Sequence, residues 1–482
     1  MHRYPHRLAL AALALAMLTL AAGGCGADDE PMTPDGTRAL AACGGTPRHH
    51  NVKPACSSGC SINSDTLIDP VARWRDRGPT LFFDDQGAVR VIYRLASDAD
   101  PRATFPASAW KQGDGFQHER LPMDFETGVL TFDNDGTSWL ITNSARHGFE
   151  QWTRSEAITS GSEQAAASWK HAGNAGAFPL WSGALARDGK GCLHAAMPLG
   201  ADAAYGVREP VGGNAQSDAS WWFGPLGGFE RVALTLDEGG AAHVAGWSQD
   251  GDGWHIAYRH AGRSERVAGI SSAAERGKVF IALARDELHP EKPARVFVLF
   301  ASQVSQPWGA TNKVVATLQL ATRNGDGRWS ISEISRDESA PACTGAPASN
   351  RDRCPWTAQQ LEPLALLGGA SLRLVLASLS VEGEDYARCD YLPGGQTGDC
   401  HWERATYNLS EKLSLQIGSL EAGGQIARTT VVKGLSSEHQ LVGGSPPLRG
   451  DARVDADGTI HVVFNDRARY DSGSRVRYLT LR

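Results

Sequence analysis

Three histidines occupy one shared position, six residues after an aspartate, in similar segments of this 482-residue chain: His194, His243 and His461. Imidazole nitrogens bind zinc and copper, so a recurring histidine raises the hypothesis of a metal ring. The alternative is a packed histidine that is hydrogen-bonded within its own repeat. We favour the packed histidine, because equivalent positions of separate repeats do not converge on one ion.

A second group of possible metal ligands lies in "HHNVKPACSSGC", where His49 and His50 precede Cys56 and Cys60. The spacing between the cysteines is loose for a zinc site, and no second knuckle follows at a suitable distance. Disulfide bonding is therefore the favoured interpretation of these cysteines. The sequence predicts neither a metal nor a cofactor.

Motifs of known enzyme chemistry are absent. The sequence has no Gly-x-Ser-x-Gly nucleophile turn, no His-Glu-x-x-His pair and no phosphate-binding loop. Aspartates in "FDNDG" and "SQDGDGW" suggest calcium, but neither stretch continues to the glutamate that an EF-hand requires, and tight hairpin turns explain them better. The 54 acidic residues leave a carboxylate pair for glycan hydrolysis open as an alternative.

A repeat organises most of the chain. Its reference aspartates are Asp84, Asp133, Asp188, Asp237, Asp286 and Asp455, of which the first five are 49, 55, 49 and 49 residues apart. A glycine follows three residues later in five of the six copies. This pattern predicts a hairpin turn in which the aspartate accepts bonds from backbone N–H groups and the glycine takes a positive φ. "LEPLALLGGASLRLVLASL" fits a seventh, degenerate copy without the aspartate.

The strand after each turn predicts how the repeats assemble. In the last copy Ile460, Val462 and Phe464 point to one face, yet Val463 on the other face is also apolar. Because both faces must be covered, we expect small sheets stacked face to face around an axis, which is an all-β propeller. Seven blades are expected, with six or eight as alternatives. The last copy ends before a fourth strand, and "SDTLIDPVARW" near the N-terminus is expected to supply it and close the ring.

The repeat core, "L-x-x-D-x-x-G-x-x-H-V", resembles the sialidase-like (BNR-type) propellers common among exported bacterial proteins. The resemblance covers about residues 64–482 and implies a fold, not an activity. Sialidases carry an arginine in a Phe/Tyr-Arg-Ile-Pro motif, for which "YRLA" is the nearest match here. Their Asp-box is approached only by "TFDNDGTSW", so sialidase activity is poorly supported.

The N-terminus resembles a bacterial lipoprotein signal. A cationic start and an apolar run of about 17 residues lead to Ala22, Gly23, Gly24 and Cys25. The resemblance implies a signal peptide over residues 1–24 and acylation of Cys25; an ordinary secretory signal and an uncleaved anchor are the alternatives. The signal peptide would be followed by a flexible tether (25–42), a Cys-stapled segment (43–63) and the propeller (64–482). Gly26, and not an aspartate that would suggest retention in the inner membrane, follows Cys25. The resemblance to lipoproteins therefore implies the outer membrane, and the periplasmic or surface side stays open.

Cleavage of the signal peptide would lower the number of lysines plus arginines from 47 to 45, against 54 acidic residues. The mature chain would then carry a formal charge of −9. Nucleic acid is thereby disfavoured as a partner. Eight cysteines besides Cys25 are consistent with disulfides in an oxidising compartment: Cys43, Cys56, Cys60, Cys192, Cys343, Cys354, Cys389 and Cys400. Cys343/Cys354 and Cys389/Cys400 are each 11 apart and are expected to close local loops. The pairing of the other four stays open.

Insertions in the fifth and sixth repeats carry three tryptophans that suit sugar faces or a partner protein: Trp308, Trp356 and Trp402. The alternative, which we favour, is that they pack the insertions onto the blades. The sequence as a whole predicts a lipid-anchored, monomeric propeller that recognises a protein or glycan at the cell envelope without catalysis. A glycan-active hydrolase or lyase is the second hypothesis. Carboxylates gathered with arginines at a channel mouth would favour the enzyme, and a Trp-lined, uncharged mouth would favour binding.

Overall fold

The computed structural model is all-β, and its described residues form antiparallel sheets and no helix. The described ranges are 43–47, 53–56, 60–72, 78–84, 87–96, 104–121, 127–132, 138–144, 148–154, 169–174, 184–199, 202–208, 222–270, 274–287, 289, 291–308, 311–339, 347–349, 351–391, 397–403, 410–421, 424–435, 449–467 and 474–482. The expected signal peptide, Cys25 and the tether lie outside these ranges. No helix among the described residues is long and apolar enough to cross a membrane.

The first four sheets follow the repeat, each with its strands in chain order. Sheet 1 holds β2 (Thr80–Phe83), β3 (Val89–Ala96), β4 (Thr104–Gln112) and β5 (Gly115–Arg120). Sheet 2 holds β6 (Thr127–Phe132), β7 (Ser138–Ser144), β8 (Gly148–Arg154) and β9 (Lys170–Asn174). Sheet 3 holds β10 (Ala184–Arg187), β11 (Leu193–Leu199), β12 (Asp202–Arg208) and β13 (Trp222–Gly227). Sheet 4 holds β14 (Glu230–Leu236), β15 (Ala242–Asp250), β16 (Gly253–His260) and β17 (Arg263–Gly269).

The remaining sheets are longer or more irregular. Sheet 5 holds β18 (Ala274–Ala284), β19 (Arg295–Trp308), β20 (Thr311–Arg323) and β21 (Trp329–Ser339). Sheet 6 holds β22 (Arg353–Leu367), β23 (Arg373–Tyr391), β25 (Ser410–Leu420) and β26 (Ile426–Leu435), and β24 (Thr397–Glu403) also pairs with β23. Sheet 7 holds β27 (Gly450–Val454), β28 (Ile460–Arg467), β29 (Ser474–Leu481) and β1 (Ile62–Ala72).

The turn chemistry expected for the repeat is present at Asp84, Asp188, Asp237 and Asp455, whose side chains accept backbone N–H groups of the turn. Asp455 Oδ1 accepts the N–H groups of Asp457 and Thr459, and Gly458 has φ +82°. The degenerate copy is also confirmed, since β22 and β23 pair around a turn that contains Gly369 at φ +100°. The turns between the first and second strands of the sheets share one end of the molecule, which we call the inner-turn end.

β1 comes from the N-terminal side of the chain and pairs antiparallel with β29, near the C-terminus. Ser61 and Arg482 also exchange backbone hydrogen bonds of 2.9 and 3.1 Å. The expected fourth strand of the last sheet is therefore present. The pairing covers an edge of β29 that would otherwise be exposed.

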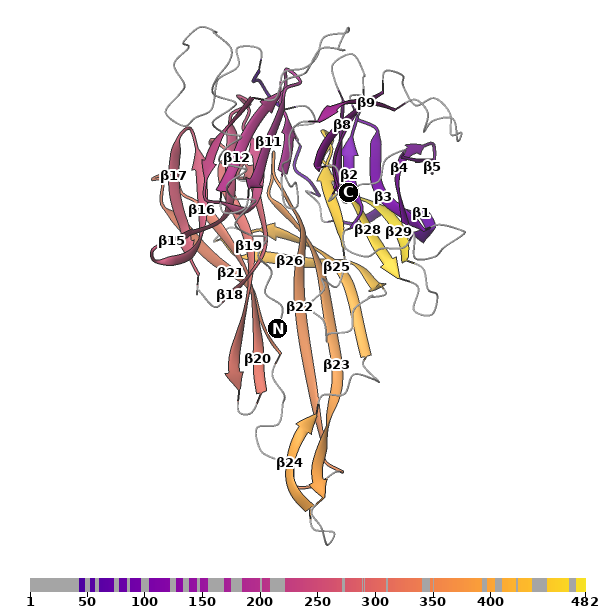
Figure 1. Cartoon of the computed structure of the whole chain (residues 1–482), viewed down its shortest axis with the longest axis vertical. Coiled ribbons are helices and arrows are strands. Elements are labelled where there is room, and N and C mark those ends of the chain that lie inside the picture. The colour runs from indigo at the N-terminus through magenta and orange to yellow at the C-terminus, as the bar shows by residue number, and fades with distance from the viewer. Residues whose placement is uncertain are drawn as a thin grey trace, which may run out of the picture.

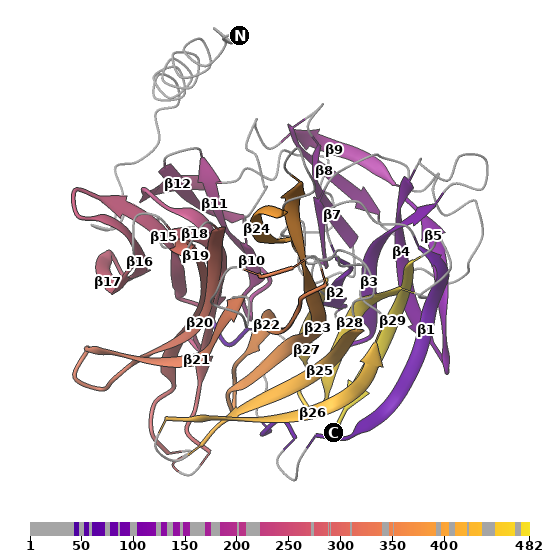
Figure 2. The same cartoon turned by 90° about the horizontal axis from the view of Figure 1, so that it is seen from below.

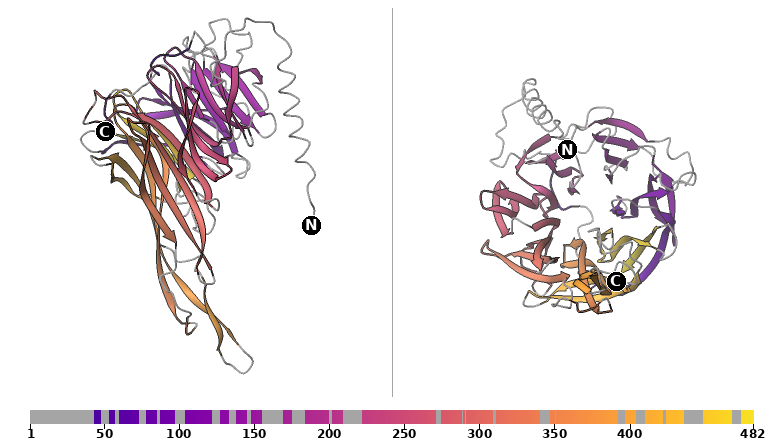
Figure 3. Two further views of the ribbon diagram at one scale, coloured as in Figure 1. Left: turned by 90° about the vertical axis from the view of Figure 1, so that its left-hand side faces the viewer. Right: turned by 60° about the horizontal axis from the view of Figure 1, so that its bottom comes forward.

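The sheets surround a common axis in a propeller-like arrangement (Figures 2 and 3). First strands of neighbouring sheets pack together along the order β10–β14–β18–β22–β27–β2–β6. β28 shows why both of its faces are apolar: Ile460 and Phe464 join the cluster with sheet 6, whereas Val463 joins the cluster with sheet 1. Each sheet is thus too thin to bury itself and becomes dry only between neighbours.

Three disulfides lie within the described residues: Cys43–Cys192, Cys56–Cys60 and Cys389–Cys400. Cys389–Cys400 is the pair that the spacing predicted. Cys354 is disulfide-bonded too, and its expected partner Cys343 lies outside the described ranges. Cross-links of this kind form and persist in oxidising, extracytoplasmic compartments.

Candidate functional site

The shared histidines lie inside their own sheets. In sheet 7, His461 Nε2 is 3.1 Å from Asp455 Oδ2, and His461 Nδ1 bonds the Tyr478 hydroxyl on the next strand. Sheet 3 repeats this chain with Asp188, His194 and Tyr205. The preferred interpretation of these histidines as packed and hydrogen-bonded within one repeat is confirmed. Each network ties the inner turn to the second and third strands.

Sheet 4 departs from this pattern. His243 Nδ1 bonds the Tyr258 hydroxyl at 2.7 Å, but His243 Nε2 is 3.6 Å from Asp237 Oδ2. A second imidazole, His260, stacks on His243 with 3.8 Å between ring centroids and 15° between planes. Burial and the neighbouring His260 lower the pKa of His243 to about 4, so this ring is neutral near pH 7. The local signal is the last residue of "WHIAYRH", His260, which sequence reasoning missed.

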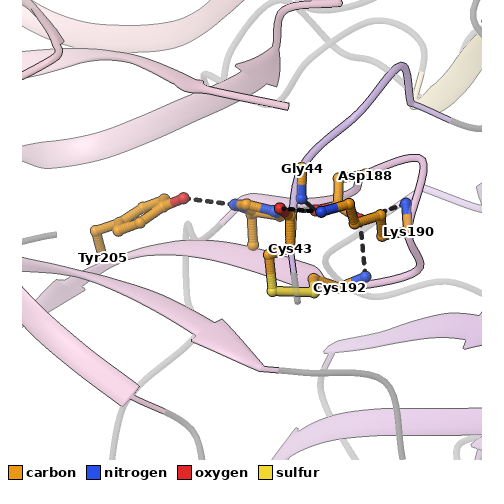
Figure 4. The surroundings of a disulfide bond; sticks show 7 residues. Cys43, Gly44, Asp188, Lys190, Cys192 and Tyr205 are labelled. Atoms are coloured by element: carbon orange, nitrogen blue, oxygen red, sulfur yellow. Dashed lines mark hydrogen bonds and ion pairs between the residues drawn. A yellow bond between two sulfur atoms is a disulfide. The ribbon is translucent and has the colours of Figure 1, made fainter. Parts of the chain in front are cut away.

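An N-terminal strap (residues 43–60, of which 43–47, 53–56 and 60 are described) runs along the inner-turn end. Cys43 is bonded to Cys192 in the inner turn of sheet 3, directly before β11, and the Gly44 N–H donates to buried Asp188 (Figure 4). Burial raises the pKa of Asp188, but the hydrogen bonds from His194 and Gly44 outweigh this and hold the pKa below its ordinary value. The Gly45 N–H donates to the Gly239 carbonyl of sheet 4 at 2.8 Å.

The same strap reaches the opposite sheets. Lys53 Nζ is 2.6 Å from Asp457 in the turn of sheet 7, and the Ala55 N–H donates to Ser371 Oγ in the turn of sheet 6 at 3.0 Å. The strap therefore contacts the inner turns of sheets 3, 4, 6 and 7. The chain itself covers the inner turns of these four sheets, so a ligand surface is expected at the other end.

A charged pocket of about 270 Å³ lies toward that other end, at the start of β18 and the end of β21. Its lining includes cations and carboxylates: Arg231, Arg276, Lys278, Glu275, Asp337 and Glu362. Lys278 Nζ is 2.9 Å from Glu362, and Arg276 Nε is 2.7 Å from Glu230. No tryptophan is among the lining residues. Carboxylates gathered with arginines were expected to favour an enzyme, and this pocket has that composition. The pocket, however, runs across sheet 5 toward its outer strand.

Asp337 is the titratable group of interest in this pocket. Burial raises its pKa to about 6, although the Leu361 N–H, which donates to Oδ2 at 3.1 Å, and Arg428 oppose the shift. A carboxyl with such a pKa is partly protonated near neutral pH and suits general acid catalysis. Sequence reasoning missed it, because nothing in "SEISRDESA" distinguishes a half-buried aspartate from a solvated one.

An arm projects from the end opposite the inner turns (Figure 1). We define it as residues 353–360 of β22, residues 379–391 of β23, and β24. Along β23 buried Asp385, Ala387 and Cys389 alternate with Glu384 and other residues that are exposed or half-buried. One face of the arm is therefore covered and the other is accessible.

The expected tryptophans lie on the arm and the neighbouring hairpin. Trp308 ends β19, and only its backbone and that of Trp356 are described. Trp356 pairs with Gly383 and Trp402 pairs with Ala387, which places both on the same face of the arm. That is the covered face, and Trp402 is half-buried there. The register places these two tryptophans on one face of the arm, on strands at opposite edges of β23 and four positions apart along it, and leaves Trp308 on another sheet.

Comparison with known proteins adds no family. No family model matches the chain, and no curated protein matches it. Among solved structures, the polysaccharide lyase Uly1 is 9% identical with a TM-score of 0.32, over 91% of this chain and 97% of its own. The N-terminal domain of Nup159 is 10% identical with a TM-score of 0.40, over 91% of this chain and 100% of its own. Drosophila Plexin A, solved with Semaphorin 1b, is 8% identical with a TM-score of 0.34, over 89% and 88%. Similarity this low carries no argument about what the chain does.

Proposed function

We propose that the chain is an exported, lipid-anchored, seven-bladed β-propeller that recognises a protein or glycan at the cell envelope without catalysis. Seven sheets among the described residues and the pairing of β1 with β29 support the blade count and a closed ring. The three disulfides support export, and the signal-like start supports a lipid on Cys25.

The observation that carries recognition is the arm. A β-projection beyond the packed sheets adds little to the core, yet here a disulfide holds its outer part together. Its accessible face bears charges such as Glu384 and Arg388, and Arg388 is paired with Glu403 at 3.1 Å. A preorganised surface of this kind loses little conformational entropy when a partner binds.

The test uses the soluble form that lacks residues 1–25 on a glycan array and in crosslinking to isolated envelope proteins. We expect a retained glycan or one dominant crosslinked protein. Glu384→Ala with Arg388→Ala should abolish this binding. Arg328→Ala, an 87% exposed side chain in a turn of sheet 5, is the matched control and should leave it intact. Binding that survives the arm variant would refute the role of the arm.

The lipid anchor has its own test. In bacterial cells, Cys25→Ala should abolish labelling by a radioactive fatty acid and move the protein from the membrane fraction to the soluble one. Labelling that persists in this variant would refute acylation at Cys25.

The charged pocket supports a second function, a glycan-active hydrolase or lyase. A half-buried acid with a raised pKa beside other carboxylates and cations is the arrangement that glycosidic-bond cleavage uses. A panel of polysaccharides assayed for new reducing ends and for unsaturated products tests this function. Asp337→Asn should abolish any activity found, and unchanged activity would exclude Asp337 from the chemistry.

A further inference from the structure

Sheet 4 carries an extra imidazole that the equivalent sheets lack. The strand register places His260 opposite His243. At the same register position Val207 lies opposite His194 in sheet 3, and Thr480 lies opposite His461 in sheet 7. The replacement therefore adds a nitrogen ligand beside an aspartate–histidine pair that is already present.

The partners of Nδ1 leave Nε2 of both histidines as the available nitrogen, and the near-parallel stack of the two rings has to open for both Nε2 lone pairs to point at one ion. His260 Nδ1 lies 3.1 Å from the Ala242 carbonyl, which only accepts, so this nitrogen carries the proton and Nε2 keeps its lone pair. His243 Nδ1 is engaged by the Tyr258 hydroxyl. In known metal sites the ligating histidine usually donates its second nitrogen to an outer partner in this way.

The unsatisfied Nε2 of His243 indicates that a ligand is missing. His243 is only 6% exposed, and its Nε2 has no hydrogen-bond partner among the described residues. The corresponding contact from Nε2 to the aspartate is 3.2 Å in sheet 3 and 3.1 Å in sheet 7, but 3.6 Å in sheet 4. Buried polar atoms are rarely left unsatisfied, so we expect a bound group between His243 Nε2 and Asp237 Oδ2.

Asp237 completes the group. Its Oδ1 accepts the N–H groups of Gly239 and Ala241, both at 2.8 Å, and its Oδ2 faces His243. One ligand atom each from Asp237, His243 and His260 lie within 4.8 Å of one another. The Asp237 side chain is 36% exposed, which leaves access for an ion and for water as a further ligand.

We propose that Asp237, His243 and His260 bind a divalent transition-metal ion, with zinc as the ion of best fit. Two imidazole nitrogens and one carboxylate favour zinc over magnesium or calcium, which prefer oxygen ligands. The nearby Arg323 does not oppose the ion strongly, because its charge is paired with Glu265 at 2.7 Å. The ion would fix the turn of sheet 4 on which the N-terminal strap rests.

The experiment measures zinc bound to the untagged chain after treatment with EDTA and dialysis, by elemental analysis and titration calorimetry. We expect one zinc per chain and a rise in Tm with zinc. His260→Thr copies sheet 7 and should lose both. Asp237→Asn retains an oxygen for the turn bonds and should weaken zinc binding by at least about tenfold, the scale of altering a partner in a metal site.

The matched control replaces the other histidine pair, His49→Ala with His50→Ala, and should still bind one zinc. No zinc on the wild-type chain, or equal zinc on wild type and His260→Thr, would overturn the proposal. Loss of zinc only in the His49/His50 variant would also overturn it and would assign the ion to the N-terminal segment. Near-UV circular dichroism establishes that each variant is folded.

Discussion

Removing the disulfide between Cys43 and Cys192 should destabilise the protein more than removing the one between Cys389 and Cys400. The first joins residues 149 apart and the second joins residues 11 apart. In the chain-entropy description, a cross-link stabilises by restricting the unfolded chain, and the effect grows with the logarithm of loop length. The losses are about 5 kcal/mol and about 3 kcal/mol, a difference of about 2 kcal/mol.

The assay is equilibrium unfolding in urea, followed by tryptophan fluorescence, for two variants with serine at both positions of one disulfide. Using serine in pairs leaves no free thiol from the broken bond. A smaller or equal loss for the long-range pair would refute the reasoning. It would mean that the strap detaches without unfolding the sheets, so that its cross-link restrains only a local segment.

Three further changes probe individual contacts. Tyr478→Phe leaves His461 Nδ1 without its bond in a buried site and should cost about 1–3 kcal/mol in thermal unfolding; an unchanged Tm would contradict the role of the network. Gly189→Ala places a Cβ 2.2 Å from a carbonyl of the strap and should speed reduction of the long-range disulfide by dithiothreitol, whereas Gly325→Ala, where a Cβ meets nothing within 4 Å, should not. Asp337 has a folded pKa of about 6, above its ordinary value of 3.8, so its ionisation opposes folding and the wild type should lose stability relative to Asp337→Asn as pH rises from about 4 to 6. A difference that is constant with pH would contradict the raised pKa.

Periodic features of the chain were predicted correctly because they depend on local chemistry. The aspartate and glycine of each turn specify a hairpin by their own side chain and φ preference, as Asp455 and Gly458 show. The fourth strand was also predicted, in "SDTLIDPVARW" (64–74), and the structure forms it at Ile62–Ala72. The pairing of the other four cysteines could not be predicted from sequence, because Cys43 meets Cys192 only when the strap crosses the inner turns.

The sequence by itself determined that the chain forms small, two-faced sheets with tight inner turns, because these properties reside within each repeat. Only the tertiary structure decided which end the strap occupies, that Asp337 lies half-buried in a charged pocket, and that His260 stacks on His243. The physical reason is that burial, pKa and ligand geometry depend on neighbours distant in the chain. Those neighbours are set by packing between sheets and by strand register, which no single repeat encodes.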